Sequence, residues 1–318
     1  MIRSPAHSLT GIHAATIVPM HDDYSLDEAA LAQHIADVTA VKGIRGLLIN
    51  GHAGENFTLT VAEKKRVVEI ARAVAPVDCY LVSGVNQESS LAAAEEASIL
   101  EQAGADALLV FPPNSWALGH ADDVVMIHHR HVLEATQCPL MIYGAPVGAG
   151  QMSYSLPILG ELVQEPRICA VKEGSWEIAA YEANRRHLKQ IRPEFIVMGS
   201  GDEHLLTSYM IGNEGSQVSL AAVIPELLCD LWEAASGGDW TRARLLHEKI
   251  YPLSVAVYRD APGGRATARL KACLKILGRL ESAALRPPQP LVTMSEYHKL
   301  EHALAHALGS LNRLPEGK

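Results

Sequence analysis

Residues 79–111, CYLVSGVNQESSLAAAEEASILEQAGADALLVF, have the pattern of a β-strand, an α-helix and a second β-strand. The runs at 79–84 and 107–111 are almost continuously apolar, as expected of strands that are buried on both faces. Between them lies an amphipathic pattern with Ser89 near its start and Gly104 where a left-handed C-cap is needed. The stretch therefore predicts one unit of a parallel sheet whose strands are joined by helices.

The same alternation of strand and helix continues from residue 11 to about residue 220. Eight strands with alternating helices predict an α/β fold, a (β/α)8 TIM barrel. A doubly wound open sheet is the alternative, but residues 15–23, ATIVPMHDD, lack the glycine-rich fingerprint that usually follows its first strand. The predicted strands are residues 11–18, 46–50, 79–84, 107–111, 140–143, 169–172, 195–199 and 216–220.

Two helices of this region begin at residue pairs spaced as capping boxes. Ser25 with Glu28 is predicted to open the first helix, and Thr60 with Glu63 the second. In such a box the hydroxyl and the carboxylate each accept a hydrogen bond from a backbone N–H that would otherwise lack a partner.

The pattern changes after residue 224 to helices without intervening strands. Turn-rich segments with GG, APGG and RPPQP separate these helices. We therefore predict a (β/α)8 barrel over residues 1–224 and a C-terminal helical segment, the extension of the barrel, over residues 225–318. The predicted helices of that segment are residues 225–235, 239–258, 265–280 and 294–307.

The composition argues against several classes of protein. The chain has 27 Lys and Arg against 36 Asp and Glu, a net charge of −9, and no basic run, so a nucleic-acid partner is not expected. No apolar stretch reaches the roughly 18 residues of a membrane span, and MIRSPAHSLTG at the start lacks the apolar core of a signal peptide. The 5 cysteines are dispersed without a CxxC pair. We therefore expect reduced thiols and a cytoplasmic protein.

Lys172 and Tyr143 end two neighbouring strands of the predicted barrel, where catalytic groups of this fold lie. Poor solvation at the end of the apolar run ICAVKEG lowers the pKa of the Lys172 amine. A neutral amine can form a Schiff base with a carbonyl substrate. Tyr143 places a phenol at the same height, where it can transfer protons.

Both residues also have a purely structural interpretation. Lys172 can extend to solvent or pair with Glu173, and Tyr143 can be a core tyrosine whose hydroxyl is satisfied. The pair at adjacent strand ends is more specific for catalysis than either residue alone.

A cluster of histidines lies in and before one predicted helix. Its members are His120, His128, His129 and His131, of which His128 and His131 share a helix face by their spacing. No HExxH motif accompanies them. A solvated helix surface is therefore favoured over a metal site, and no metal is predicted.

Three motifs stand at corresponding strand ends. GHAGE at residues 51–55 follows the second predicted strand, Tyr-x-x-Pro at 143–146 follows the fifth, and VKEG at 171–174 ends the sixth. With the opening GIHAATIVPM and the SGD after the seventh strand, this combination resembles the dihydrodipicolinate synthase / N-acetylneuraminate lyase family, whose enzymes are Schiff-base-forming aldolases. The resemblance runs from about Gly11 to Ser310.

The resemblance implies a Schiff base between Lys172 and pyruvate or another 2-oxo acid, with Tyr143 as the proton shuttle. The loop from Gly51 to Gly54 is then expected to hold the keto-acid carboxylate, partly through backbone N–H groups. Family members commonly form tetramers through their C-terminal helices, so a homotetramer or homodimer is expected. The mechanism implies no metal and no dissociable cofactor.

This chain departs from the family in the loop after the second strand. Family members usually have GTTGE or GSTGE, whereas this chain has His52 and Ala53 in place of the two hydroxyl residues. Ala53 has no side-chain donor, so its carboxylate contact falls to the backbone. For His52 two interpretations stay open, because the imidazole can take over the proton relay or can fill space.

Further departures concern the second substrate. The synthase branch has a tyrosine pair after strand four, where this chain has Phe111-Pro-Pro-Asn114, and an arginine after Tyr-x-x-Pro, where Gly148 stands. Arginines elsewhere that could fold back are Arg192, Arg259 and Arg265. We therefore expect poor condensation of pyruvate with aspartate semialdehyde, the reaction of 4-hydroxy-tetrahydrodipicolinate synthase.

Asp202 and Glu203 follow the seventh strand, where members of the lyase branch bind a polyhydroxylated chain. An equal alternative is that these carboxylates cap the next helix. The predicted catalytic residues are Lys172, Tyr143 and His52, and the predicted substrate-binding residues are Gly51, Ala53, Gly54, Gly201, Asp202 and Ser219.

The leading hypothesis is a class I, Schiff-base-forming lyase, namely an aldolase, dehydratase or synthase acting on pyruvate or another 2-oxo acid. A paralogue that binds a keto acid or sugar acid without turnover is the alternative outside enzymes. Within enzymes the alternative is 4-hydroxy-tetrahydrodipicolinate synthase. The expected partners are a small 2-oxo acid and further copies of the same chain.

Overall fold

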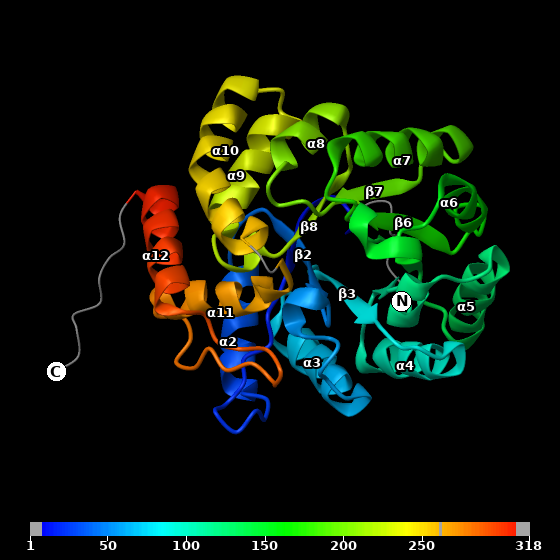
Figure 1. Cartoon of the computed structure of the whole chain (residues 1–318), viewed down its shortest axis with the longest axis horizontal. Helices are drawn as coiled ribbons and strands as arrows, with labels where there is room; N and C mark the ends of the chain where they lie inside the picture. Colours follow the sequence, from blue (N-terminus) through cyan, green and yellow to red (C-terminus); the bar gives the residue numbers. More distant parts are fainter. Residues whose placement is uncertain (1–7, 261–262, 310–318) are drawn as a thin grey trace.

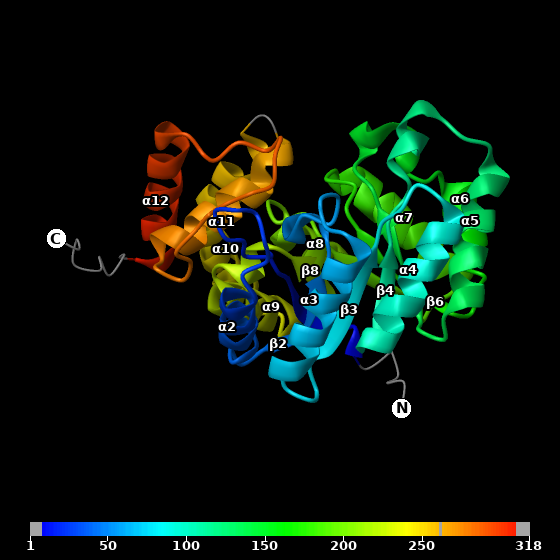
Figure 2. The same ribbon diagram turned by 90° about the horizontal axis from the view of Figure 1, so that it is seen from below.

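The protein is described by a computed structural model over residues 8–260 and 263–309. Eight parallel strands close into a barrel in the order β1 to β8, and helices surround it (Figure 1, Figure 2). The predicted (β/α)8 TIM barrel is therefore confirmed, and the open-sheet alternative is wrong. The strands are β1 (Gly11–Ala15), β2 (Ile44–Ile49), β3 (Tyr80–Val85), β4 (Ala107–Val110), β5 (Leu140–Gly144), β6 (Ile168–Glu173), β7 (Ile196–Gly199) and β8 (Gly215–Val218).

A helix follows each strand along the chain. These helices are α2 (Glu28–Thr39), α3 (Val61–Val74), α4 (Ser90–Ala103), α5 (Asp122–Ala135), α6 (Leu156–Leu162), α7 (Ile178–Ile191), α8 (Leu205–Ile211) and α9 (Pro225–Ser236). Short turns of 3-10 helix lie in the loops at η1 (His52–Gly54), η2 (Asn114–Leu118), η3 (Val147–Met152) and η4 (Leu220–Ala222). Among the described residues, no helix is long and apolar enough to cross a membrane. Residues 1–7, part of the stretch in which no signal peptide is expected, lie outside the described residues.

The sheet has an apolar cluster on each face, because successive strand residues point in opposite directions. Leu81, for example, belongs to the outer cluster that joins the strands to the helices. Its neighbour Val82 belongs to the inner cluster, which also contains Met141 and Met198 and fills the barrel. Burial on both faces explains why the strands could be predicted as continuous apolar runs.

The first predicted capping box is wrong. The cap of α2 is Asp27, whose carboxylate accepts from the Ala30 N–H at 2.9 Å. The Ser25 hydroxyl instead donates to Asp23 at 2.6 Å. The carboxylate next to Glu28 therefore takes the capping position that the spacing predicts for Ser25.

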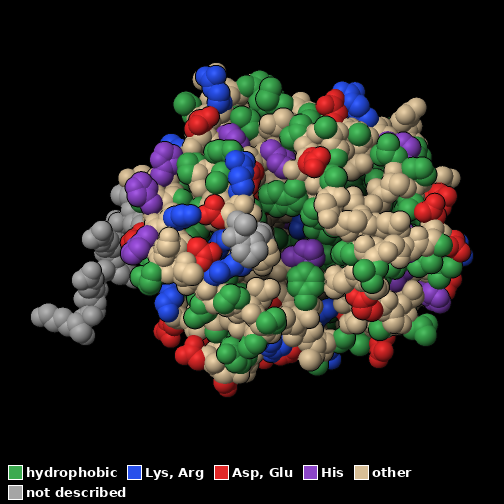
Figure 3. All heavy atoms as spheres, in the orientation of Figure 1, with side chains coloured by type: hydrophobic (Ala, Val, Ile, Leu, Met, Phe, Trp, Pro, Cys, Tyr) green, Lys and Arg blue, Asp and Glu red, His purple; other side chains and the backbone are tan. Residues whose placement is uncertain are grey.

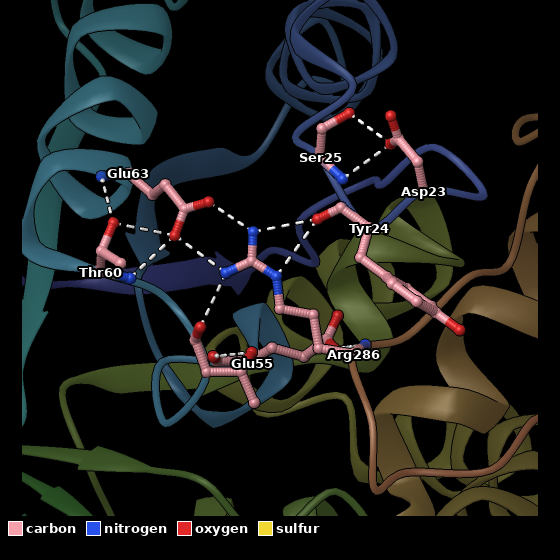
Figure 4. A network of polar contacts seen from close by, with 8 residues as sticks. Asp23, Tyr24, Ser25, Glu55, Thr60, Glu63 and Arg286 are labelled. Carbon is pink, nitrogen blue, oxygen red and sulfur yellow. Dashed lines mark hydrogen bonds and ion pairs between the residues drawn. The ribbon is translucent and has the colours of Figure 1, made fainter.

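The second predicted capping box is confirmed and is joined to the C-terminal segment. Thr60 accepts from the Glu63 N–H at 3.2 Å, and the Glu63 carboxylate accepts from the Thr60 N–H at 2.8 Å. Figure 4 shows the Arg286 guanidinium beside the same carboxylate, to which it donates at 2.8 Å. Arg286 also donates to the Thr58 and Tyr24 carbonyls at 2.7 and 3.0 Å. One arginine thus holds together the loops that follow β1 and β2.

After α9 the chain is helical, as predicted. Its elements are α10 (Trp240–Ser254), the π-helix η5 (Val255–Arg259), the 3-10 turn η6 (Gly263–Arg265), α11 (Ala266–Ile276) and α12 (Met294–Leu308). Figure 1 shows α10, α11 and α12 gathered on one side of the barrel. The helix α9 contacts both β1 and α8, the position of a barrel helix, and also packs on α10. The boundary at residue 224 stays a prediction, since the chain crosses it inside one packed unit.

A buried ion pair joins the loop after β2 to α11. Lys271 donates to the Glu55 carboxylate and, at 2.7 Å, to the Ala284 carbonyl. The two side chains are 0% and 5% exposed. Burial lowers the pKa of Lys271, and the charge of Glu55 opposes that shift. The loop that carries His52 and Ala53 is therefore fixed by a residue of the C-terminal segment.

We expect Lys271→Met to destabilise the protein by about 3–5 kcal/mol, because Glu55 would be left as a buried charge without its partner. Chemical denaturation measures the change. The matched control is Lys299→Met, which removes an ion pair with Asp260 that is 59% and 38% exposed, and whose loss should cost at most about 1 kcal/mol. An equal loss of unfolding free energy in the two variants would show that the pair of Lys271 with Glu55 is not the more stabilising one.

Candidate active site

The C-terminal ends of the strands surround a cavity of about 440 Å³. Figure 3 shows a hollow at the centre of this face, with a histidine and hydrophobic side chains at its edge. Loops and strand ends from β2, β5, β6, β7 and β8 contribute to its wall. The predicted site residues that line it are His52, Ala53, Tyr143, Lys172, Asp202 and Ser219.

Lys172 and Tyr143 face each other across two hydrogen-bonded strands. They are partners in the register of β5 and β6, and the Lys172 Nζ lies 5.8 Å from the centre of the Tyr143 ring. The alternative partner of the amine, Glu173, is turned away. Its carboxylate accepts instead from Asn184 at 2.9 Å and from the Ser175 hydroxyl at 3.1 Å. The lysine amine is therefore free to meet a ligand in the cavity.

Burial changes the charges in the cavity. It lowers the pKa of Lys172 to about 8, while the negative charge of Asp202 opposes that shift. Burial also raises the pKa of Asp202 to about 7, against a hydrogen bond from the Leu220 N–H and the charge of Lys172. The phenol of Tyr143 stays neutral, since burial raises its pKa above the ordinary value. At pH 7 about one tenth of Lys172 is thus a neutral amine, far more than of an ordinary lysine.

Asp202 is held from two sides. Its carboxylate accepts from the Leu220 N–H at 3.0 Å, and its backbone carbonyl accepts from the Ser254 hydroxyl at 3.0 Å. Tyr258 of η5 faces both Asp202 and Ser219. The C-terminal segment therefore contributes directly to the wall of the cavity. Neither predicted alternative for Asp202, sugar binding or helix capping, anticipated that contact.

His52 packs among aromatic rings. Its ring centre lies 4.7 Å from that of Phe57, 4.5 Å from that of Phe111 and 5.0 Å from that of Tyr143. Burial and the nearby Lys172 lower the pKa of His52 to about 3. The imidazole is therefore neutral at physiological pH and presents a flat aromatic surface to the cavity.

The predicted glycines do not line the cavity but shape the backbone around it. A Cβ on Gly201 would lie 2.1 Å from the His204 ring, and one on Gly54 would lie 3.3 Å from the Thr16 carbonyl oxygen. A Cβ on Gly51 would likewise lie 3.3 Å from the Leu48 side chain. The substrate contacts assigned to these glycines stay predictions.

Several lining residues were not predicted. Phe57, Trp176, Gln217 and Tyr258 all face the cavity. Trp176 has a φ of 61°, unusual for a bulky residue. Gln217 had a sequence signal, a large polar residue inside the buried strand β8, whereas Tyr258 is remote in sequence from every predicted site residue.

The arginines that could have folded back are engaged elsewhere. Arg192 donates to three backbone carbonyls that follow α6 and enter β6. Arg259 pairs with Glu203, and Arg265 pairs with Glu296 at 2.9 Å. None of these arginines lines the cavity. Because Glu203 pairs with Arg259, it also does not line the cavity.

The histidine cluster is not the solvated helix surface that the sequence pattern favours. His128 and His129 are 1% and 0% exposed. The His128 ring packs 5.4 Å from that of Trp116, and the His129 Nδ1 donates to the Val125 carbonyl at 2.9 Å. The prediction is wrong because aromatic partners from other loops cover these rings. Among the described residues, no group of three His, Cys, Asp or Glu side chains could hold a metal ion.

Comparison with known proteins identifies similarities over nearly the whole chain. The model of the dihydrodipicolinate synthetase family matches residues 8–307. The 4-hydroxy-tetrahydrodipicolinate synthase 1 of Streptomyces coelicolor is 32% identical over 86% of this chain and 86% of its own. The 4-hydroxy-tetrahydrodipicolinate synthase of Methanopyrus kandleri is 28% identical over 97% and 98%. The crystal structure of dihydrodipicolinate synthase from Agrobacterium tumefaciens superposes with a TM-score of 0.85 at 26% identity, over 96% and 100% of the two chains.

We expect Lys172 to titrate near pH 8 in the folded protein, well below an ordinary lysine, because burial disfavours its charged form. Competitive labelling with acetic anhydride across pH 6–11, read by peptide mass spectrometry, measures this pKa. The exposed Lys42 is the internal control for a lysine amine in contact with solvent.

Asp202→Asn should move the titration of Lys172 to lower pH, since the carboxylate stabilises the ammonium form. A Lys172 that titrates together with Lys42 would show that the amine is solvated.

Proposed function

The chain belongs to the dihydrodipicolinate synthetase family, a family of lysine Schiff-base enzymes, and we propose that its reaction joins or separates pyruvate and a second carbonyl compound in this cavity. Lys172 is the nucleophile and Tyr143 the acid/base. The observation that carries the proposal is their juxtaposition, a partly neutral buried amine beside a phenol on the neighbouring strand.

The proposed cycle begins when the neutral Lys172 amine adds to the 2-oxo carbon. Tyr143 donates a proton to the carbinolamine, and loss of water leaves a protonated imine. The imine withdraws electrons from the adjacent methyl group, which loses a proton to the deprotonated Tyr143 and becomes an enamine. The enamine carbon attacks the second carbonyl compound, whose oxygen takes a proton from Tyr143. Hydrolysis of the imine then returns the free amine.

The turn η1 supports a site for the pyruvate carboxylate. Because this turn begins at His52, its first N–H groups lack partners within the helix. Ala53 lines the cavity without a side-chain donor, so these backbone groups would carry the contact. Thr267 of α11 donates to the His52 carbonyl at 3.2 Å and fixes the turn from the other side.

For His52 we propose a packing role and not a proton relay. An imidazole whose pKa is about 3 is a weak base at neutral pH, and general acid–base catalysis is most effective with a pKa near the working pH. Its ring contacts with Phe57 and Tyr143 favour the same role. Tyr143 would then transfer the protons alone.

A second candidate is 4-hydroxy-tetrahydrodipicolinate synthase itself, the name of the Streptomyces and Methanopyrus relatives. Against it stands the chain at Val147-Gly148-Ala149, which has no arginine for the carboxylate of aspartate semialdehyde. A third, non-catalytic candidate is a keto-acid-binding paralogue. Such a paralogue would also form the imine with Lys172 but would not turn over a substrate, so a rate measurement distinguishes it from an enzyme.

We also propose a cellular compartment and an oligomeric state for the enzyme. The free thiols of Cys138, Cys169, Cys229 and Cys273 support a reducing compartment, the cytoplasm. The family resemblance supports assembly into a homotetramer or homodimer, which analytical ultracentrifugation would measure.

The experiment that tests the proposal is reduction with borohydride in the presence of pyruvate. We expect one added pyruvate on Lys172 by peptide mass spectrometry, because reduction converts the imine to a stable secondary amine. Lys172→Ala should abolish the label, while the exposed Lys42→Ala serves as control and keeps it. A label on another lysine, or none, would refute the mechanism.

We expect Tyr143→Phe to slow turnover by roughly 10²–10⁴-fold, the usual effect of a lost acid/base, while the fold is kept. Steady-state rates and thermal unfolding measure the two effects. The matched control is Tyr154→Phe, which removes a buried hydroxyl that has no hydrogen-bond partner among the described residues and lies outside the cavity. Unchanged rates in Tyr143→Phe would assign proton transfer to a different group.

A further inference from the structure

Two pairs of aromatic rings stand at the cavity, one on the loop after β2 and one formed by the loop after β6 together with η5. His52 and Phe57 follow β2, with ring centres 4.7 Å apart. Trp176 follows β6, and its ring centre lies 5.2 Å from that of Tyr258. In a closed barrel of eight strands in sequence order, β2 and β6 lie across from each other. The entrance to Lys172 is therefore flanked by rings from two opposite sides.

Two of these residues adopt an energetically unfavourable state in the protein without a ligand. Phe57 is 56% exposed, although a large apolar side chain is more stable when buried. Trp176 has a φ of 61°, a strained backbone conformation for a residue with a bulky side chain. Exposed apolar surface and backbone strain at a cavity are both typical of ligand-binding positions.

The charges of the cavity disfavour an anionic group on the second substrate. The only charged side chains in its described wall are Lys172 and Asp202. When Lys172 is bound as an imine, no other cation of that described wall remains to pair with a second carboxylate, which would then be buried without a partner. The residues 261 and 262, outside the described chain, are Ala and Pro and carry no charge.

The cavity also has a polar atom without a partner. The Gln217 Oε1 is buried, has no hydrogen-bond partner among the described residues and belongs to a residue that lines the cavity. The Tyr258 hydroxyl, by contrast, meets Asp202 and Ser219. A ligand that donates a hydrogen bond, as the hydroxyl group of an aldol product does, can satisfy the Gln217 oxygen, since buried polar atoms are normally paired.

We propose that the second substrate is an uncharged aromatic aldehyde. This inference rests on the proposed function and names the substrate class of the same site. In the synthetic direction C3 of the pyruvate enamine bonds to the aldehyde carbon, and the aldehyde oxygen takes a proton from Tyr143. Water then hydrolyses the imine and releases a 4-aryl-4-hydroxy-2-oxobutanoate. Cleavage runs through the same steps in reverse and needs no other reactant.

The test compares pyruvate-dependent turnover of aldehydes that differ in one property each. Cyclohexanecarbaldehyde has the size of benzaldehyde without its aromatic ring, and 4-carboxybenzaldehyde adds a negative charge. Benzaldehyde should exceed the first by roughly tenfold in kcat/KM, the effect of favourable ring contacts. It should exceed the second by at least about tenfold, because the added carboxylate would be buried without a cation to pair with. Glyceraldehyde and aspartate semialdehyde represent the polyhydroxylated and amino-acid alternatives.

Single substitutions test which side chains produce the preference for benzaldehyde over cyclohexanecarbaldehyde. Phe57→Leu and Trp176→Leu should reduce the benzaldehyde to cyclohexanecarbaldehyde ratio to within about threefold, since each removes one ring contact. Phe57 is exposed, so its variant should fold even if that of Trp176 does not. Trp240→Leu, a surface tryptophan at the start of α10 that is 41% exposed, is the matched control and should leave the ratio unchanged.

Borohydride trapping of pyruvate on the same samples distinguishes a wrong substrate class from a wrong mechanism. If pyruvate is trapped and glyceraldehyde, aspartate semialdehyde or the charged aldehyde is the best substrate, the aromatic class is wrong and the imine chemistry stands. The aromatic class is equally wrong if pyruvate is trapped and no aldehyde reacts. If pyruvate is not trapped, the proposed function fails and the inference with it.

Discussion

The desolvation of Lys172 inside a closed barrel is the constraint on which the site depends. Closing eight strands places this residue at the end of β6, where neighbouring side chains cover most of it from water. An amine there loses much of its preference for the charged form. The neutral form becomes more populated, and only that form can act as a nucleophile. Asp202 limits the effect, because its carboxylate favours the ammonium form. The balance leaves the pKa near the physiological range instead of far below it.

The C-terminal segment is part of the site as well as of the fold. Tyr258 and Thr267 reach the cavity from η5 and α11, and the buried pair of Lys271 with Glu55 fixes the loop after β2. The barrel provides the strand ends, and the added helices close one side of the cavity over them. Fold stability and site geometry are therefore coupled through the same contacts, so changes in α11 would affect both.

The sequence predicted well what depends on local pattern. Every strand was placed to within a few residues, since burial on both faces produces continuous apolar runs. Lys172 and Tyr143 were paired because strand order determines which ends are neighbours. Tyr258 was missed because it meets Asp202 only through the packing of α10 and η5. His128 and His129 were misplaced for a related reason, since Trp116 and Tyr154, which pack on them, come from distant loops. Such contacts between remote segments leave no periodic signal.

The division between barrel and loops also explains how relatives of one family can share the imine and differ in its partner. The amine and the phenol stand on strands, which the barrel holds rigidly. The groups that would meet a second substrate, among them His52, Phe57 and Trp176, stand on loops that can change without disturbing the sheet. A chain can thus keep the pyruvate half of the reaction while its loops replace a guanidinium by aromatic rings. Electrostatics makes that exchange consequential, because a carboxylate bound beside Asp202 would need a cation that the described wall of the cavity does not supply.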